Sequence, residues 1–570
     1  MSQNTSGIHL ARPRKSVQVH LPDGRVFQGA PNTLLATFFQ KAFPGMANPP
    51  VAAIINGNLS ELTRPVVHDI EVIPVFLSDS DGMRIYCRSL SFLLIVAAYK
   101  LFPRAQLFID YSVPHGGYFC QVERGRPLSS AQLSKIEKLM QTMVNENEPI
   151  IRERLSVDEA KEVFASRQEL HKVQLLEGLK EKHIPVYSLY GFRDYFYGYM
   201  VPSTGYLQIF ALEPFSKGFI LRFPRRENPR KLLPPQRFTV LRKVFDEYGK
   251  WLNLLGVADV NSLNKAIDSG RIEQVILISE ALHEKRIAEI AGVIARRQKK
   301  QRHLVFIAGP SSSGKTTFSK RLSIQLLAQG CRPYALQMDD YFLSRDQMIK
   351  GKNKEFDFDS IDAVDIPFFK QQLYALLAGN KVNLPRYDFY TGTRELGSTV
   401  TLEPSSVLLV EGIHCLNPRL AADLTEGDVL RIFVSAITQL NLDRHNRVST
   451  RDTRLIRRIV RDAASRGYTA EETIGLWENV RQGEKQNIFP YQEQADIMFN
   501  SALVYELAVL KPLVEPLLLQ VENVRARIET QRLLAFLRWF KPYTAGIIPS
   551  NSILREFIGG SSLDNPTRTS

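Results

Sequence analysis

One segment of the sequence has the spacing of a phosphate-binding loop. Residues 309–316, GPSSSGKT, match the pattern G-x-x-x-x-G-K-[ST] at every fixed position. An apolar run precedes the segment and a helical pattern follows it, so backbone amides and a helix N-terminus would surround phosphate oxygens. Lys315 would bring a charge to the β- and γ-phosphates of ATP, and Thr316 a hydroxyl to Mg²⁺. A chance loop rich in glycine and serine is the alternative. The residues expected around the nucleotide are Gly309, Pro310, Ser311, Ser312, Ser313, Gly314, Lys315, Thr316 and Thr317.

Acidic residues follow two of the predicted strands downstream of this loop. Residues 334–338 read as a strand that is followed by Asp339 and Asp340. Because α/β folds bind ligands at the carboxyl ends of strands, we expect Asp339 to be the general base for an acceptor hydroxyl. Asp340 is the rival, and both could merely cap a turn. The apolar run 407–410 ends in Glu411, a pattern typical of a carboxylate that holds Mg²⁺ through water.

Arginines recur at three- and four-residue spacing in a third segment, which predicts one face of a helix. Such a face could close over ATP and neutralise charge on the transferring phosphoryl group. It could also be a solvated face, or one that binds nucleic acid. The arginines are Arg451, Arg454, Arg458 and Arg461, and Arg466 follows them.

The pattern of strands and helices changes at the phosphate-binding loop. From residue 303 to about 521, strands and helices alternate, which is typical of an α/β domain. Before it, residues up to about 77 read as a small β-rich module, and residues 130–165 read as helical. Residues 185–223 are rich in Tyr, Phe and Gly and read as β-hairpins, whereas residues 238–301 are mostly helical.

Composition limits the class of protein. A chain of 570 residues is too long for one ordinary domain, and 44% hydrophobic with 23% charged residues excludes a wholly disordered chain. The net charge of +14 favours anionic partners without naming them. The four cysteines lie far apart, which fits a reducing cytoplasm, and no secretory signal is recognised at the N-terminus. The most apolar run, residues 90–98, is too short to span a bilayer, so we expect a buried helix and no membrane partner.

Residues 304–521 resemble the uridine kinase/phosphoribulokinase family of P-loop kinases. The motifs that carry the resemblance are GPSSSGKTT, MDDYF, DFDSIDAVD, LPRYDF, VEGI and RLIRRIVRDAASRG. The resemblance implies that an acceptor hydroxyl is phosphorylated by ATP with Mg²⁺. Carried over by position, it implies a catalytic aspartate at Asp339, a ribose-binding aspartate at Asp359, a nucleoside-pocket tyrosine at Tyr387, a magnesium-binding glutamate at Glu411, and lid arginines at Arg458, Arg461 and Arg466.

Two departures from that family concern the acceptor and the lid. Uridine and cytidine kinases carry a pyrimidine-reading histidine five residues after the tyrosine, where this sequence has Gly392. A second lid arginine is replaced by Tyr468. A glycine cannot reach a base edge, so the identity of the acceptor stays open. Arg386 and Arg394 on the acceptor side could instead favour an anion such as a sugar phosphate.

The N-terminal part resembles threonyl-tRNA synthetases. VHLPDGRVF and INGNL are similar to their TGS domain, a β-grasp fold, and the stretch from RSLSFLLIVAAYKLFP through RFPR is similar to their editing domain. The His and Cys positions of the editing domain's metal-like site are here Arg88, Phe92, Phe196 and Met200. We therefore expect no editing hydrolysis. A structural or regulatory role comes first, and binding of a nucleotide or nucleic acid remains an alternative.

The sequence thus predicts an α/β P-loop kinase domain, a parallel sheet with flanking helices, behind a β-grasp TGS-like domain and an α+β editing-like domain. The expected boundaries are 1–80 for the TGS-like domain, 81–230 for the editing-like domain, 231–300 for a helical linker, 301–521 for the kinase domain, and 522–570 for a C-terminal helical extension and tail.

The expected function is ATP-dependent, Mg²⁺-dependent phosphorylation of a small-molecule hydroxyl in the cytoplasm, with a nucleoside as the favoured acceptor. Asp339 would be the base, Lys315 and the lid arginines would stabilise the phosphoryl group, and Asp359, Tyr387 and Arg394 would hold the acceptor. One alternative is a sugar-phosphate kinase, and another is an RNA- or ribosome-associated nucleotide switch that contacts RNA through the N-terminal domains. The family relatives suggest a homo-oligomer.

Overall fold

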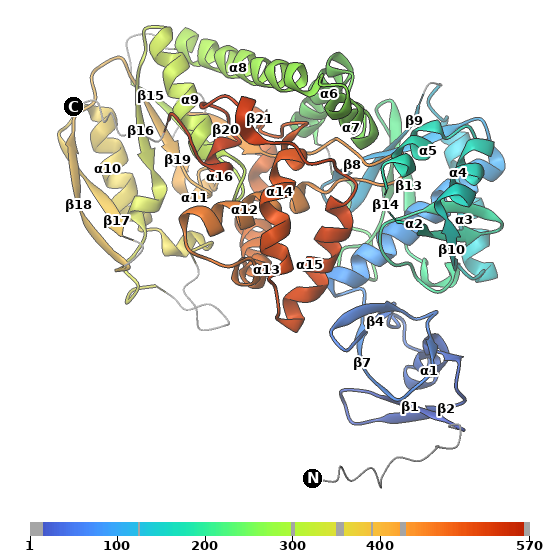
Figure 1. Cartoon of the computed structure of the whole chain (residues 1–570). Helices are drawn as coiled ribbons and strands as arrows, with labels where there is room; N and C mark the ends of the chain where they lie inside the picture. Colours follow the sequence, from blue (N-terminus) through green and yellow to red (C-terminus); the bar gives the residue numbers. More distant parts are fainter. Residues whose placement is uncertain are drawn as a thin grey trace, which may run out of the picture. The chain divides into compact units, whose positions relative to one another are not determined.

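The computed structural model divides into two compact units (Figure 1). The structure describes residues 15–123, 126–179, 181–236, 238–297, 302–348, 358–388, 391–421 and 429–563. The first unit comprises Met1–Gln236 together with Asp443–Asn446, and the second comprises Arg237–Leu442 together with Arg447–Ser570. The helices predicted for residues 238–301 and beyond residue 521 therefore belong to the same unit as the phosphate-binding loop.

The first unit begins with a β-grasp module. Its five-stranded sheet has the order β2-β1-β7-β4-β5, with β1 and β2 forming the predicted hairpin and β1 parallel to β7. In β1, alternate residues are buried, as expected for a strand with one face on a core. The strands are β1 (Val17–His20), β2 (Val26–Gly29), β4 (Ala52–Ile55), β5 (Asn58–Glu61) and β7 (Ile70–Val75), with the small pair β3 (Thr33–Leu34) and β6 (Pro65–Val66). The helix α1 (Leu35–Ala42) buries Leu35, Phe38 and Phe39 in the core.

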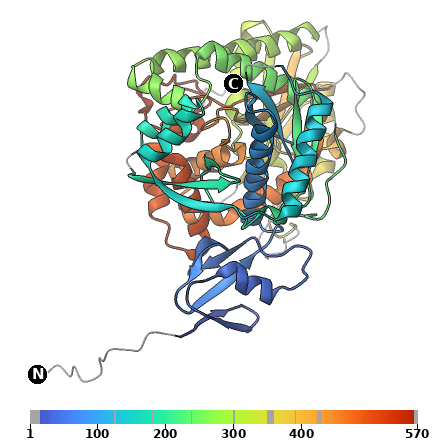
Figure 2. The same ribbon diagram turned by 90° about the vertical axis from the view of Figure 1, so that its right-hand side faces the viewer.

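The apolar run at residues 90–98 lies in the long helix α2 (Ser80–Leu101). By length and composition this helix could cross a membrane, but 78% of its most apolar 18-residue window is buried inside the protein. Figure 2 shows it as a long blue helix beside the teal helices and strands of the same unit. Burial on this scale is typical of a core helix, in agreement with the prediction.

Two antiparallel sheets and three further helices complete this part of the first unit. The four-stranded sheet has the order β13-β14-β9-β8, and the three-stranded sheet has the order β10-β11-β12. The strands are β8 (Gln106–Val113), β9 (Gly117–Glu123), β10 (Ile151–Ser156), β11 (His183–Leu189), β12 (Phe192–Tyr195), β13 (Ala211–Phe215) and β14 (Gly218–Arg222). The helices are α3 (Ser130–Glu146), α4 (Val157–Ser166), α5 (Leu170–Glu177) and the short turn η1 (Thr204–Tyr206). The predicted helical stretch 130–165 is thus interrupted by β10.

Residues 443–446 contribute to a buried polar cluster of the first unit. The Lys172 ammonium contacts a carboxylate oxygen of Asp194, and it lies 2.9 Å from Nδ1 of His445. Nδ1 of His445 lies 2.5 Å from the other Asp194 oxygen. Burial alone would lower the pKa of Lys172, but Asp194 and the other nearby carboxylates raise it above its usual value. These groups satisfy one another, which is typical of a structural polar cluster.

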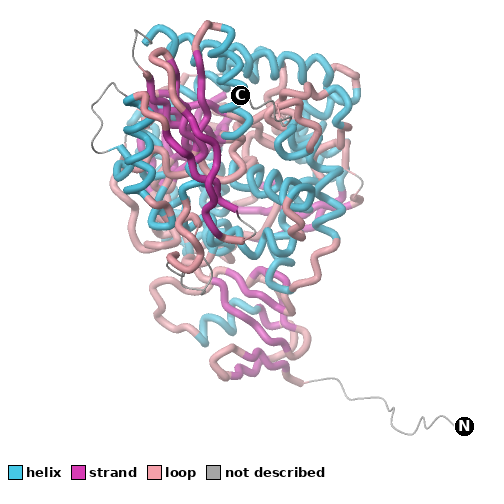
Figure 3. Tube along the Cα trace, turned by 90° about the vertical axis from the view of Figure 1, so that its left-hand side faces the viewer, coloured by secondary structure: helices cyan, strands magenta, loops and turns pink. Residues whose placement is uncertain are grey.

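The second unit is built on a five-stranded parallel sheet of order β16-β19-β15-β20-β21. Figure 3 shows its strands in magenta with helices in cyan around them. The strands β15 and β19 are almost wholly buried, as expected for a parallel sheet covered on both faces. The strands are β15 (His303–Ala308), β16 (Arg332–Gln337), β19 (Ser406–Glu411), β20 (Val429–Ser435) and β21 (Ile497–Asn500), with the separate hairpin β17 (Val382–Asp388) and β18 (Thr393–Val400).

Helices from both ends of the second unit surround this sheet. Before it come α6 (Thr239–Leu255), α7 (Val260–Asp268) and α8 (Ile272–Arg297); within it come α9 (Lys315–Ala328), α10 (Ile366–Ala378), α11 (Pro418–Ala421), α12 (Thr450–Ser465) and α13 (Ala470–Asn487); after it come α14 (Glu506–Leu519), α15 (Val524–Leu537) and α16 (Arg555–Ile558). The short turns are η2 (Met338–Tyr341), η3 (Ile361–Ala363), η4 (Phe489–Gln494) and η5 (Ala545–Ile547). Helix α8 packs along α9, so it supports the helix that begins at the phosphate-binding loop.

Candidate active site

The phosphate-binding loop has the backbone conformation that the sequence predicts. The loop joins the end of β15 to the start of α9. Ser312 and Gly314 have positive φ angles of 57° and 84°, as in a loop whose amides turn inward. A Cβ atom at Gly309 would lie 2.0 Å from the carbonyl oxygen of Val434, so only glycine fits there.

Several polar groups of the loop are left for a ligand. The side chains of Ser312 and Ser313 are buried, and their hydroxyls have no hydrogen-bond partner in the described part of the chain. The Lys315 ammonium donates to the carbonyl oxygen of Pro310 at 3.2 Å, which folds the side chain back over the loop. Buried polar groups without partners are costly, and phosphate oxygens would satisfy them.

Thr316 and Glu411 form the pair expected to hold a metal ion. The Thr316 hydroxyl donates to Oε1 of Glu411 at 2.7 Å, with Glu411 at the end of β19. Burial raises the pKa of Glu411 to about 7, although Lys315 and the Thr316 hydroxyl act in the opposite direction. A hydroxyl and a carboxylate at this distance are the oxygen ligands that Mg²⁺ prefers, so the residues fit the ion.

Asp339 and Asp340 lie in the turn η2, which follows β16. Asp339 is exposed, so an acceptor can reach its carboxylate. Desolvation by the surrounding protein raises its pKa above the usual value, the charge of Asp340 adds to this, and Lys315 and Arg466 oppose it. Asp340 has a structural task, because its Oδ1 accepts the Tyr387 backbone N–H at 3.1 Å. The geometry therefore favours Asp339 over Asp340 as the base.

Helix α12 brings two arginines directly onto the phosphate-binding loop. Nη1 of Arg458 donates to the Ser311 hydroxyl at 3.0 Å. Nε of Arg454 donates to the Ser311 carbonyl oxygen at 2.9 Å. The predicted helical face is present, but its members have different partners, because Arg451 approaches Glu529 at the other end of the helix.

One carboxylate holds the three predicted lid arginines together. Asp462 accepts hydrogen bonds from Nε of Arg458 at 3.1 Å and from Nη2 of Arg461 at 2.8 Å. Arg466 lies 3.7 Å from the same carboxylate, and about half of its side chain is exposed. Three cations with one carboxylate leave a net positive charge close to the loop.

Sequence reasoning missed a glutamate that lies on the loop. Oε1 of Glu484, on helix α13, accepts the Ser311 backbone N–H at 2.9 Å and also pairs with Arg454. Its side chain is 2% exposed. Glu484 is one of four glutamates in the helical segment 470–487 and belongs to no motif, and only the fold shows that it meets a residue about 170 positions earlier.

A second missed glutamate comes from the C-terminal segment. Oε2 of Glu556, in α16, accepts the Thr317 backbone N–H at 3.2 Å and the Thr317 hydroxyl at 2.8 Å. Close by, the Ile553 side chain lies 2.6 Å from where a Cβ atom at Gly314 would be. The segment predicted as a C-terminal extension therefore covers the start of α9, where a carboxylate is favoured by the helix dipole.

The predicted acceptor residues lie beside an aromatic cluster. The ring of Tyr387, which is 5% exposed, lies 5.7 Å from Phe342 and 6.2 Å from Phe358, measured between ring centroids. Asp359 follows Phe358 directly, and its carbonyl oxygen accepts a hydrogen bond from Asn487. The structure thus brings Asp359 and Tyr387 to one part of the unit, while Arg394 pairs with another carboxylate, Asp365, at 3.0 Å.

An arginine occupies the space beside Gly392. A Cβ atom at Gly392 would lie 2.3 Å from Cδ of Arg345, and the Arg345 backbone N–H donates to the Gly392 carbonyl oxygen at 3.0 Å. The charge of Arg345 also acts on Tyr387, whose pKa is raised by burial and lowered by this arginine. The absence of a side chain at position 392 therefore makes room for a cation.

Among the described residues of the first unit, the four metal-like positions carry no His, Cys, Asp or Glu side chain to bind a metal ion. Phe92, Phe196 and Met200 are buried in the hydrophobic core, with the rings of Phe92 and Phe196 5.4 Å apart. Arg88 donates to the Tyr199 carbonyl oxygen at 2.6 Å. Across the described ranges, no group of three or more His, Cys, Asp or Glu side chains could hold a metal ion.

Comparisons with known proteins agree with this division of the chain. A threonine–tRNA ligase of Paraburkholderia phymatum is 35% identical over 197 residues, which are 34% of this chain and 31% of the ligase. The chain therefore spans about a third of the length of the curated relatives that it matches. The similarity concerns the TGS-like and editing-like region at the N-terminus.

One family model matches part of the second unit, and solved kinase structures are similar to part of the chain. A possible uridine kinase from Bacillus stearothermophilus is 22% identical, with 38% of this chain and 98% of that chain covered and a TM-score of 0.27. A D-glycerate 3-kinase from Cryptococcus neoformans is 16% identical, with 36% and 87% covered and a TM-score of 0.27. Residues 304–508 match the model of the phosphoribulokinase/uridine kinase family, and the phosphate-binding loop lies within this match.

Proposed function

We propose that this protein transfers the γ-phosphoryl group of ATP to a hydroxyl of a small molecule. The observation that carries the proposal is the position of Lys315. Its charge acts on both Asp339 and Glu411, so a phosphate cation, a candidate base and a candidate metal ligand lie in one site. The family match of residues 304–508 supports the same reaction class.

In the proposed reaction each group has one task. The loop amides and Lys315 hold the phosphates, and Asp339 accepts the proton of the acceptor hydroxyl. Arg458, Arg461 and Arg466 neutralise the charge that spreads over the phosphoryl oxygens. Thr316 and Glu411 are the residues that would hold Mg²⁺, and the bound ion would add positive charge that offsets the charge of the phosphates.

The favoured acceptor is a nucleoside. The aromatic cluster around Tyr387 offers an apolar surface for a base, and Asp359 offers a carboxylate for ribose hydroxyls. One observation favours a second candidate, an acceptor that carries an anion such as a sugar phosphate. Arg345 packs against Gly392, which places a cation beside the position where uridine and cytidine kinases carry a pyrimidine-reading histidine.

Several wider expectations stay part of the proposal. The proposed domains have boundaries at residues 80, 230, 300 and 521. A cytoplasmic location agrees with the four free cysteines. A homo-oligomer is proposed because the resemblance to the kinase family suggests one. The similarity to threonine–tRNA ligases supports a contact with RNA through the N-terminal domains. In that case RNA binding would weaken steeply with salt.

The test is acceptor-dependent release of ADP. The purified chain is incubated with ATP, Mg²⁺ and either nucleosides or sugar phosphates, with Lys315→Ala as the blank. Release with nucleosides supports the favoured acceptor, and release with sugar phosphates only supports the second candidate. ATP binding without release for any hydroxyl acceptor would contradict the kinase proposal and favour a nucleotide switch.

A further inference from the structure

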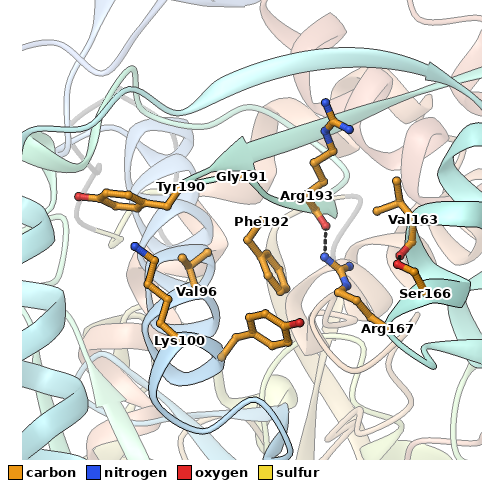
Figure 4. A pocket seen from close by; sticks show the side chains of 10 residues that line it. Val96, Lys100, Val163, Ser166, Arg167, Tyr190, Gly191, Phe192 and Arg193 are labelled. Atoms are coloured by element: carbon orange, nitrogen blue, oxygen red, sulfur yellow. Dashed lines mark hydrogen bonds between the residues drawn. The ribbon is translucent and has the colours of Figure 1, made fainter.

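The first unit contains a cavity that none of the proposed reactions uses. Its volume is about 330 Å³, within the range of small-ligand sites. It lies between the end of α2, the end of α4 and the turn that joins β11 to β12, as Figure 4 shows. On α2, its residues Val96, Tyr99 and Lys100 lie beyond Arg88 and Phe92, so it is a different place from the metal-like positions.

Aromatic rings form part of the cavity wall. The rings of Tyr99 and Phe192 lie 4.9 Å apart, tilted at 57°, and Tyr190 lines the cavity from the β11–β12 turn. Tyr99 is 41% exposed, so one ring is open to a ligand that enters from solvent. Rings of this kind bind planar apolar groups by stacking or edge contacts.

Cations form the rest of the cavity wall. The Lys100 ammonium lies 3.6 Å above the Tyr190 ring, and within the described residues it meets no carboxylate. The Arg167 guanidinium lies 4.1 Å above the Phe192 ring and donates to the Arg193 carbonyl oxygen, and in the described part of the chain its Nε is buried without a hydrogen-bond partner. Figure 4 shows Lys100 beside Tyr190, and Arg167 on the other side of Phe192, where it donates to the Arg193 carbonyl oxygen.

The cavity lining contains three cations and no carboxylate. Two carboxylates reach two of these cations from outside the lining: Glu169 pairs with Arg167 at 2.9 Å, and Glu153 pairs with Arg193 at 3.0 Å. Among the described residues, Lys100 is thus the lining cation that pairs with no carboxylate, although it lies over the Tyr190 ring, whose hydroxyl donates to Glu146. A cavity of this kind selects an anion that also carries a planar ring.

We propose that this cavity binds a nucleoside monophosphate unit, with the base against the aromatic rings and the phosphate on Lys100 and Arg167. The unit can be a free nucleotide or the terminal residue of a single-stranded RNA, because both present the same base and phosphate. The site is separate from the phosphate-binding loop, so its occupancy does not depend on the kinase proposal.

The test measures binding by calorimetry to the full chain that carries Lys315→Ala, which removes the main phosphate cation of the kinase site. The probes are AMP, UMP, adenosine, ribose 5-phosphate, inorganic phosphate and a short single-stranded RNA. We expect AMP or UMP to bind more tightly than adenosine, ribose 5-phosphate or inorganic phosphate, because only nucleotides satisfy both halves of the site. Tighter binding of the RNA than of AMP would identify RNA as the source, and equal or weaker binding would identify the free nucleotide.

Adding Lys100→Gln should weaken AMP binding about tenfold, since one charge-assisted contact is lost. The matched control is Lys135→Gln, an exposed lysine on α3 away from the cavity, which should leave the affinity unchanged. Equal affinity in the Lys100 and Lys135 variants, no binding of AMP or UMP, or equal binding of inorganic phosphate would overturn the proposal. In the chain with native Lys315, Lys100→Gln should leave ADP release unchanged, so failure of this proposal and failure of the kinase proposal are distinguishable.

Discussion

The phosphate-binding loop of the second unit and the metal-like positions of the first unit differ in what their side chains leave unsatisfied. Around the loop, Ser312 and Ser313 keep buried hydroxyls that meet no partner among the described residues, and Glu411 has a raised pKa. At the metal-like positions, Phe92 and Phe196 pack against each other as ordinary core residues. A site that awaits a ligand retains a local energetic cost, whereas a site that has lost its ligands is filled by packing. The unsatisfied groups of the second unit fit the proposed phosphoryl transfer, whereas the packed side chains at the metal-like positions fit a structural role.

The largest expected effect concerns the loop. Lys315→Ala removes the cation that neutralises the β- and γ-phosphates, so ADP release should fall about a thousandfold. Steady-state assays at saturating ATP measure this, with Lys135→Ala as the control for loss of a surface charge. Retained turnover in the Lys315→Ala variant would show that the loop does not supply the phosphate cation, and the proposed contrast between the loop and the metal-like positions would fail.

The next effect concerns the packed positions of the first unit. Phe92 is 0% exposed, so Phe92→Ala should lower the free energy of unfolding by about 3 to 5 kcal/mol. Leu101→Ala, on the same helix but 38% exposed, should cost far less. Denaturant unfolding followed by circular dichroism measures both, and a negligible cost at Phe92 would mean that this position is not a packed core.

A smaller effect tests whether the C-terminal segment belongs to the loop. Glu556→Ala leaves the Thr317 N–H and hydroxyl without their acceptor, which should destabilise the second unit by about 1 to 2 kcal/mol. Glu522→Ala, at an exposed position, is the matched control. Thermal unfolding monitored with and without ATP measures the difference, and identical melting of the two variants would place Glu556 outside the site.

The smallest effect is a shift in pH dependence. The proposed base must be ionised, so the rate should fall as the pH falls through the raised pKa of Asp339. The charge of Asp340 contributes to that raised pKa, so Asp340→Asn should move the acid limb of kcat/KM to lower pH. The asparagine can still accept the Tyr387 N–H through its side-chain oxygen. An acid limb that does not move would argue against Asp339 as the titrating base.

Local motifs predicted the parts of the site that one segment encodes. The loop, its flanking strand and helix, and the carboxylates that end β16 and β19 follow from patterns of a few residues, and the fold has them. Glu484 and Glu556 could not be found in this way, because each meets the loop from a helix more than 150 residues away. The arginine face of α12 was predicted, but the separate partners of its members depend on which helices pack against it.

The same limit explains two differences in the fold. Residues 130–165 carry helical patterns on both sides of Pro149, and only pairing with β11 makes residues 151–156 a strand. Arg457 stands outside the predicted arginine face and carries no sequence signal, yet it is fully buried, where it donates to Glu506 at 2.5 Å and to the Ser501 carbonyl oxygen at 2.8 Å. Long-range contacts therefore override local pattern at both places.

The central claim is that Asp339 accepts the proton of an acceptor hydroxyl while the loop holds ATP. Its most direct test is acceptor-dependent ADP release by the native chain and by Asp339→Asn, with ATP affinity measured in parallel. The account predicts that the variant binds ATP with unchanged affinity and loses about a hundredfold or more in turnover. Native turnover in Asp339→Asn would contradict it.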